Sequence, residues 1–179
     1  MSAGRTILID TREQTPLPIS GPVERTTLYS GDYSIKGLEH LFAVERKSLD
    51  DLMQSLTAGR ERFERELHRL RGFRFKRLLI IGSEDAVINH RYRSRISPKA
   101  ALHSLYAIEA RFDIPVVFSP SPASGAILIE RWAYWYSRET VNNAQLAVNS
   151  GEFRVNIEPA SLDKMVSSPP ILPAATAKI

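Results

Sequence analysis

The chain has 179 residues, and 43% of them are hydrophobic, which suits one globular domain with a buried core. Cysteine is absent, so disulfide frameworks and thiolate metal sites are excluded, and no apolar run approaches the ~18 residues that a membrane span needs. The net charge is +4, and all but six of the 24 basic residues are arginine, whose planar guanidinium suits bidentate phosphate binding. This composition is compatible with a nucleic-acid partner but does not identify one.

Short strands and loops are predicted for the first part of the chain. An apolar run at 7–9 ends in Asp10 and predicts a strand over 5–13. Residues 14–22 hold three prolines and a glycine and predict a loop. Residues 24–37 are rich in β-branched and aromatic residues but are interrupted by Ser30, Gly31 and Asp32, which predicts two short strands or one bent strand. The next strand is predicted over 40–47.

Helices and strands alternate after that point. Ser48 is a favoured N-cap for a predicted helix over 48–59, and a second helix follows over 60–72. A buried strand is predicted over 76–83, a helix over 97–112 that begins with Ser97 and Pro98, a strand over 114–120 and a helix over 121–139. This order predicts an α/β fold with some parallel strand pairing.

The periodic pattern fades from Val141 onward, and prolines cluster at 169, 170 and 173. We therefore predict a folded domain over residues 1–140. Residues 141–179 are predicted to form a tail that is partly disordered or carries a small docking element.

Charged side chains gather at the end of the 40–47 strand. Glu45 and Lys47 are two residues apart, so they project from one face of the strand, and Arg46 projects from the other. A short antiparallel hairpin would bring Asp32 close to Glu45. Neighbouring carboxylates repel unless a cation lies between them, and Mg²⁺ or Mn²⁺ prefers such oxygen ligands. With a lysine beside the ion, these are the parts that phosphodiester hydrolysis needs.

Taken alone, the spacing of Glu45 and Lys47 is also typical of an ordinary surface ion pair on an edge strand. The surrounding motifs favour a functional site. Asp10 ends the first strand, Glu13 follows three residues later, and Asp51 lies six residues beyond Glu45.

In this order the motifs resemble the XPF-type nuclease domain family of structure-specific DNA endonucleases. The family pattern of G-D, a spacer and E-R-K-x-x-x-D is matched by Gly31, Asp32, Glu45, Arg46, Lys47 and Asp51. A D-x-R-E element is matched by Asp10, Arg12 and Glu13, and an S-L-x-x-G-R element by Ser55, Leu56, Gly59 and Arg60. The resemblance covers roughly residues 5–138.

The resemblance implies a restriction-endonuclease-like α/β fold, in which helices flank a central mixed sheet. It also implies Mg²⁺- or Mn²⁺-dependent cleavage of DNA near duplex–single-strand junctions, in repair or recombination. By position, the implied metal ligands are Asp32 and Glu45, with Asp10 as a further acid near the ion. Lys47 would be the catalytic lysine, and the remaining members of the catalytic set would be Glu13, Arg46 and Asp51. For Arg46 and Asp51 the alternative is a structural hydrogen bond between the two.

Several arginines are predicted to contact DNA. By resemblance, Arg12 and Arg60 shape the site or bind phosphates. The basic helix and the basic loop at 90–95 add Arg62, Arg65, Arg69, Arg91 and Arg93. Tyr92 in the loop would stack on an unpaired base. The alternatives are a solvated helix surface and a plain polar loop.

Partners are predicted from the last helix and from the resemblance. The helix carries Trp132, Trp135 and Tyr136 at helical spacing, a pattern typical of a core, whereas family members commonly dimerise through their last two helices. We therefore expect a homodimer or heterodimer. Family members often carry helix-hairpin-helix or helicase domains, and neither pattern is recognisable here. The N-terminus lacks the apolar region of a signal peptide, so a cytoplasmic protein is expected, associated with the nucleoid if prokaryotic.

Two other functions remain open on sequence grounds. The first is a catalytically silent DNA-binding scaffold that partners another nuclease, against which the intact Glu45-Arg46-Lys47 motif argues. The second is a nuclease that acts on RNA, which the resemblance makes less favoured than DNA.

Overall fold

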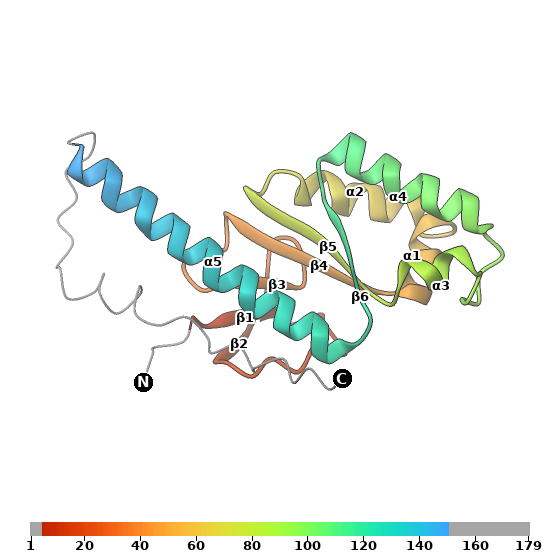
Figure 1. The fold of residues 1–179 in the computed structure, drawn as a ribbon, viewed down its shortest axis with the longest axis horizontal. Coiled ribbons are helices and arrows are strands. Elements are labelled where there is room, and N and C mark those ends of the chain that lie inside the picture. The colour runs from red at the N-terminus through yellow and green to blue at the C-terminus, as the bar shows by residue number, and fades with distance from the viewer. Residues whose placement is uncertain (1–4, 151–179) are drawn as a thin grey trace, which may run out of the picture.

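Residues 5–150 are described by a computed structural model (Figure 1). The strands are β1 (Ile7–Asp10), β2 (Val23–Thr26), β3 (Tyr33–Ile35), β4 (Phe42–Ser48), β5 (Phe75–Ile81) and β6 (Val116–Ser119). The helices are α1 (Leu49–Leu56), α2 (Arg60–Leu70), α3 (Glu84–Ile88), α4 (Pro98–Phe112) and α5 (Pro122–Asn149).

The six strands form one mixed sheet in the order β2-β1-β3-β4-β5-β6. β3 is antiparallel to both of its neighbours, whereas β1 and β2, β4 and β5, and β5 and β6 pair in parallel. Residues 42–44 of β4 and 78–80 of β5 form apolar runs that are fully buried, because both faces of the sheet are covered there, as is usual for parallel pairs. The predicted α/β class with a mixed sheet is confirmed.

Helices cover the two faces of the sheet unequally (Figure 1). α1, α2 and α4 pack on one face, around Ala43, Leu78 and Ile80. α5 crosses the other face and packs against Val44 and Leu79 with its buried residues. Because side chains alternate along β4, its successive residues contribute to the two cores in turn. The charged end of β4 therefore lies between two packed layers.

Helix starts agree with the capping signals in the sequence. The Ser48 hydroxyl accepts the Asp51 N–H at the start of α1, and Ser97 caps α4 in the same way with Pro98 in the first turn. Gly59, predicted as the end of the first helix, instead precedes α2, because α1 already ends at Leu56.

Two features differ from the predicted elements. The short helix α3 was not predicted, and α5 continues beyond the predicted boundary at 140 to Asn149. The remainder of the predicted tail, residues 151–179, lies outside the described part of the chain. Among the helices of residues 5–150, none combines the length and the apolarity needed to cross a membrane.

Candidate active site

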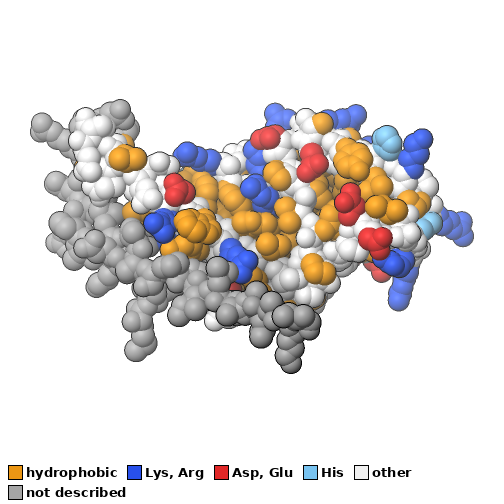
Figure 2. All heavy atoms as spheres, in the orientation of Figure 1, with side chains coloured by type: hydrophobic (Ala, Val, Ile, Leu, Met, Phe, Trp, Pro, Cys, Tyr) orange, Lys and Arg blue, Asp and Glu red, His pale blue; other side chains and the backbone are white. Residues whose placement is uncertain are grey.

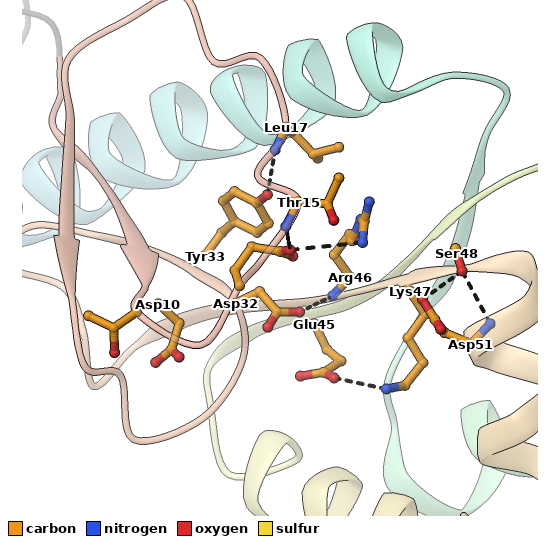
Figure 3. A network of polar contacts seen from close by, with 12 residues as sticks. Asp10, Thr15, Leu17, Asp32, Tyr33, Glu45, Arg46, Lys47, Ser48 and Asp51 are labelled. Atoms are coloured by element: carbon orange, nitrogen blue, oxygen red, sulfur yellow. Dashed lines mark hydrogen bonds and ion pairs between the residues drawn. The ribbon is translucent and has the colours of Figure 1, made fainter.

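The antiparallel pair β3–β4 brings Asp32 and Glu45 together. Tyr33 is paired with Val44, and the Asp32 N–H donates to the Val44 carbonyl at 2.8 Å. The N–H of Arg46 in turn donates to Asp32 Oδ2 at 2.8 Å. The residue before β3 is thus held opposite the charged end of β4, as the predicted hairpin requires (Figure 3).

Gly31 allows this close approach of the two strands. Its φ is +78°, a left-handed conformation that favours glycine. A Cβ at this position would lie 3.0 Å from the Val44 carbonyl oxygen. The Gly31-Asp32 motif therefore needs a glycine for steric reasons, because any side chain at position 31 would push Asp32 away from β4.

Glu45 and Lys47 project from the same face of β4. Lys47 Nζ lies 3.2 Å from Glu45 Oε1, and the Arg46 side chain points in the opposite direction (Figure 3). α2 completes the surroundings of the lysine, because Nζ lies 4.7 Å from the centre of the Phe63 ring and 3.8 Å from Glu66 Oε2. Only 8% of the Lys47 surface is exposed, so its ammonium group is held in one place.

The pKa values of both acids are raised, and a bound cation would favour their ionised forms. Burial, followed by the negative charge of Glu45, raises the pKa of Asp32 to about 8. Burial also raises the pKa of Glu45; the charge of Lys47 opposes this rise, and that of Glu66 adds to it. Without a cation, both carboxylates are therefore biased toward their protonated forms.

This donor set fits a hard divalent ion. Within residues 5–150, no three His, Asp or Glu side chains converge as a complete metal cage. Mg²⁺ does not need one, because it keeps several waters and is commonly held by one or two carboxylates together with substrate phosphate oxygens. Asp32 and Glu45 would be the two carboxylates of such a site.

Both acids and Lys47 open into a cleft of about 780 Å³. Basic and acidic side chains from the turn after β1, from the segment before β3 and from β4, α1 and α2 line it together. Of the residues predicted from the sequence, those that line the cleft are Arg12, Glu13, Asp32, Glu45, Arg46, Lys47, Asp51, Arg62 and Arg69.

Asp10 lies beside this cleft without lining it. Its carboxylate, 1% exposed, accepts hydrogen bonds from the Arg12 side chain at 2.7 and 3.0 Å and from the N–H groups of Arg12 and Leu28 at 2.8 and 2.7 Å. Burial alone would raise the pKa of Asp10, but these donors outweigh it and hold the pKa below its usual range. A metal ion at Asp10 would have to displace one of these donors.

A comparison with protein families decides the relationship. The model of the ERCC4 domain matches residues 9–132, a range that contains the whole cleft. The chain belongs to the ERCC4 domain family. The predicted membership in the XPF-type nuclease domain family is thereby confirmed.

Solved structures agree with this assignment. XPF from Aeropyrum pernix is similar with a TM-score of 0.63 and 22% identity, over 94% of this chain and 70% of that chain. Its complex with DNA is similar with a TM-score of 0.61 and 23% identity, over 75% of this chain and 66% of that chain. At such identity the likeness shows the fold, and it confirms the restriction-endonuclease-like architecture. No curated protein matches the chain.

Two residues of the ERCC4 domain motif have local partners that the sequence did not reveal. Arg46 does not pair with Asp51; its Nη1 lies 3.9 Å from Glu13 Oε1. Asp51 accepts the Ser48 hydroxyl at 2.6 Å, which closes a reciprocal cap at the start of α1. Within residues 5–150 the buried Nε of Arg46 has no hydrogen-bond partner. Arg46 therefore has an unused hydrogen-bond donor, whereas the Asp51 carboxylate is hydrogen-bonded.

The predicted DNA-contacting arginines fall into two groups. Arg62 and Arg69 line the cleft, and Arg62 also pairs with Glu66. Arg60, although on the same helix, faces α4 and pairs with Glu64 at 3.1 Å, and Arg65 is exposed away from the cleft. The basic loop at 90–95 does not line the cleft either. There Arg91 pairs with Asp85, and the Arg93 N–H donates to Asp50.

Glu66 and Tyr29 are among the cleft residues that were not singled out from the sequence. Glu66 lies one turn beyond Phe63 on α2, and Tyr29 lies just before the Gly31-Asp32 motif. The helical spacing of Phe63 and Glu66 was visible, but nothing in the sequence shows which side of α2 meets β4. Nothing in the sequence marked Tyr29 as a cleft residue, because an aromatic residue before a turn usually belongs to the core.

Proposed function

We propose that the protein is a divalent-metal-dependent DNA endonuclease that hydrolyses phosphodiester bonds at branched DNA or duplex–single-strand junctions. The observation that carries this proposal is the juxtaposition of Asp32, Glu45 and Lys47 in an arginine-lined cleft. Family membership supports it, as does the fold shared with a protein whose complex with DNA is known. A role in DNA repair or recombination follows from that substrate class.

Asp32 and Glu45 would hold Mg²⁺ or Mn²⁺. When bound, such an ion lowers the pKa of a coordinated water and polarises a phosphoryl oxygen. Lys47, fixed between Glu45 and the ring of Phe63, places a positive charge where charge develops on the phosphate during attack. Its burial excludes water from one side of the ammonium group, which strengthens this interaction.

The remaining charged residues of the cleft would bind the DNA backbone. Arg46 lines the cleft, so its guanidinium would contribute positive charge toward a bound phosphate. Arg62 and Arg69 continue the positive side of the cleft along α2. Asp10 would act indirectly, because it fixes Arg12 at the edge of the cleft.

Self-association would use the face of the sheet that α5 crosses. Hydrophobic side chains gather on this face (Figure 2). The partly buried Val117, Leu128 and Trp132 pack against its core, and Ile127 and Trp135 of α5 are 46% and 54% exposed. We define these five residues as the α5 face. Apolar surface of this kind, with exposed aromatic residues, is typical of a protein interface. A second copy of the chain is the proposed occupant.

The proposal is tested by incubating the protein with labelled flap, splayed-arm, Holliday-junction and plain duplex DNAs. Each DNA is tested with Mg²⁺, with Mn²⁺ and with EDTA. We expect cutting that depends on the metal and is concentrated near one type of junction. Binding without cutting under every metal would contradict the nuclease and would favour the silent scaffold.

A further inference from the structure

Tyr29 is an exposed aromatic residue on the wall of the cleft. Its side chain is 78% exposed, the largest value among the exposed large hydrophobic residues of the described chain. It lies three residues before Asp32 and lines the same cleft as Glu45 and Lys47. A tyrosine this exposed contributes little to the core, so its position calls for another explanation.

The backbone on both sides of Tyr29 is fixed. The N–H of Leu28 donates to Asp10 Oδ2 at 2.7 Å, and its carbonyl accepts Arg12 Nη2 at 2.9 Å. On the other side, Ser30 is 8% exposed, and Gly31 packs against the backbone of Val44. Tyr29 is thus the one exposed residue in a segment of buried ones, from Leu28 to Gly31. The Asp10–Arg12 pair therefore helps to fix the backbone from which the Tyr29 side chain projects beside the cleft.

The surroundings of Tyr29 suit a nucleotide. Arg12, at the same edge of the cleft, is 67% exposed in its side chain, so a phosphate can approach its guanidinium. A flat aromatic ring beside cationic groups is the arrangement that holds single-stranded nucleic acid, because bases stack on the ring and phosphates meet the charges. Because the backbone of this segment is already ordered, less conformational entropy is lost on binding than with a mobile loop.

Tyr92, the aromatic residue that the sequence analysis considered for stacking, is less suited to it than Tyr29. Tyr92 is only partly exposed; it packs against the core and donates its hydroxyl to the Ile96 carbonyl at 2.8 Å. It also contacts His90, with 4.5 Å between ring centres. Tyr92 is already engaged within its own loop, whereas the ring of Tyr29 faces solvent.

We infer that Tyr29 is a stacking platform for an unpaired nucleobase next to the phosphodiester bond that is cut. This inference rests on the proposed function and narrows it. A base must leave the duplex to stack on Tyr29, so the site favours DNA in which a nucleotide beside the cut is already unpaired, such as a splayed arm or flap. Continuous duplex would have to unpair a base first.

The test compares Tyr29→Ala and Tyr29→Phe with the wild type on a splayed-arm DNA and on continuous duplex. Both binding, in Ca²⁺ without cutting, and cleavage in Mg²⁺ are measured. Tyr29→Ala is expected to weaken splayed-arm binding about tenfold, the effect of losing one stacked base, and to leave the weak binding of duplex unchanged. Tyr29→Phe keeps the ring and is expected to behave like the wild type. Tyr106→Ala is the matched control, since Tyr106 is 54% exposed on α4 and does not line the cleft.

A base analogue adds a readout that does not depend on catalysis. With 2-aminopurine at successive positions around the cut, stacking should quench its fluorescence at one position in the wild type and in Tyr29→Phe but not in Tyr29→Ala. Equal binding and equal quenching in the wild type and Tyr29→Ala would overturn the inference while leaving the nuclease intact. A wild type that neither binds nor cuts any of these DNAs would contradict the proposed function itself.

Discussion

The ammonium group of Lys47 is shared between two carboxylates, and only one of them belongs to the family motif. Glu45 Oε1 lies 3.2 Å from Nζ and is two residues away on the same strand, whereas Glu66 Oε2 approaches to 3.8 Å from α2. Glu66 also pairs with Arg62 at 3.2 Å. The acid on α2 thus ties the lysine to the basic side of the cleft.

Replacing Glu66 tests whether it positions Lys47. We expect Glu66→Ala to lower kcat for cleavage about tenfold, because Lys47 loses one of the groups that orient it. The KM for DNA should stay equal or fall, because a negative charge near the phosphates is removed. Glu66→Gln, which keeps an acceptor, should retain more activity. Glu64→Ala is the matched control, since Glu64 pairs with Arg60 on the far side of α2. A rise in KM with unchanged kcat would contradict a positioning role.

The raised pKa of Asp32 predicts a pH-dependent stability of the metal-free protein. Asp32 titrates at about 8 in the folded chain and near its ordinary value of ~4 in the unfolded chain. Between these values the folded state holds a proton that the unfolded chain has released, so this contribution to stability is complete below pH ~4 and is lost as the pH rises through about 8. The melting temperature of the protein in EDTA should therefore fall from pH 5 to pH 8.

Asp32→Asn isolates this effect. The amide cannot ionise, so the variant should melt higher than the wild type at pH 8, and its melting temperature should vary less with pH. Added Mg²⁺ should raise the melting temperature of the wild type more at pH 8 than at pH 5, because the ion binds ionised carboxylates. Parallel melting curves for the two proteins across this range would show that Asp32 is not perturbed as described.

At the scale of elements, the junction before β3 determines whether the two acids meet. Gly31→Ala would place a Cβ 3.0 Å from the Val44 carbonyl in a backbone with positive φ. We expect a loss of about 2 kcal/mol in the free energy of unfolding, measured with urea, together with weaker Mg²⁺ binding, because Asp32 shifts away from Glu45. Gly37→Ala is the control, since Gly37 has a φ of +84° with nothing within 4 Å of the added Cβ. Equal losses in the two variants would rule out the clash with β4.

Much of this arrangement was predictable from the sequence. Ser48 and Ser97 were recognised as N-caps because a hydroxyl before an apolar helical pattern has few other uses. The meeting of Asp32 and Glu45 followed from the period of a strand and the length of the hairpin between them. Helix capping and strand periodicity depend mainly on residues that are close in the sequence, so they can be predicted without the tertiary structure.

Other features depend on contacts that the sequence does not display. The partners of Arg46 and Asp51 were not predicted, because Glu13 reaches Arg46 from a distant segment and Asp51 turns back to Ser48. The length of α5 was underestimated, because the residues after Val141 lack an apolar stripe. The backbone nonetheless continues the helix, since Gly151 is the first glycine or proline after Gly125. Tertiary packing decided which side of α2 faces the cleft.

At the scale of the whole molecule, the proposed DNA-binding cleft and the proposed dimer interface use different parts of the sheet. Residues of α1 and α2 line one side of the cleft, and α5 crosses the sheet on the face opposite to these two helices (Figure 1). A second copy bound at the α5 face would therefore leave the cleft open to DNA.

Light scattering tests this association. The wild type should have a mass of about 40 kDa, twice the 20.2 kDa of one chain, and Trp135→Glu should shift it toward the monomer. Trp135 is 54% exposed, so its replacement should cost little stability. Tyr106→Ala, on α4, should remain dimeric. A wild type that is monomeric at all concentrations, or a Trp135→Glu variant that stays dimeric, would contradict the proposed interface.

The most direct test of the account is a cleavage assay on one splayed-arm DNA with the wild type, Asp32→Asn and Glu45→Gln. Binding of the same DNA is measured in parallel. We predict cutting by the wild type in Mg²⁺ and none in EDTA, and a loss of at least a hundredfold in both variants, roughly the contribution of a metal site, with DNA binding retained. Undiminished cutting by Glu45→Gln, or cutting by the wild type in EDTA, would show that Asp32 and Glu45 do not form the site of hydrolysis.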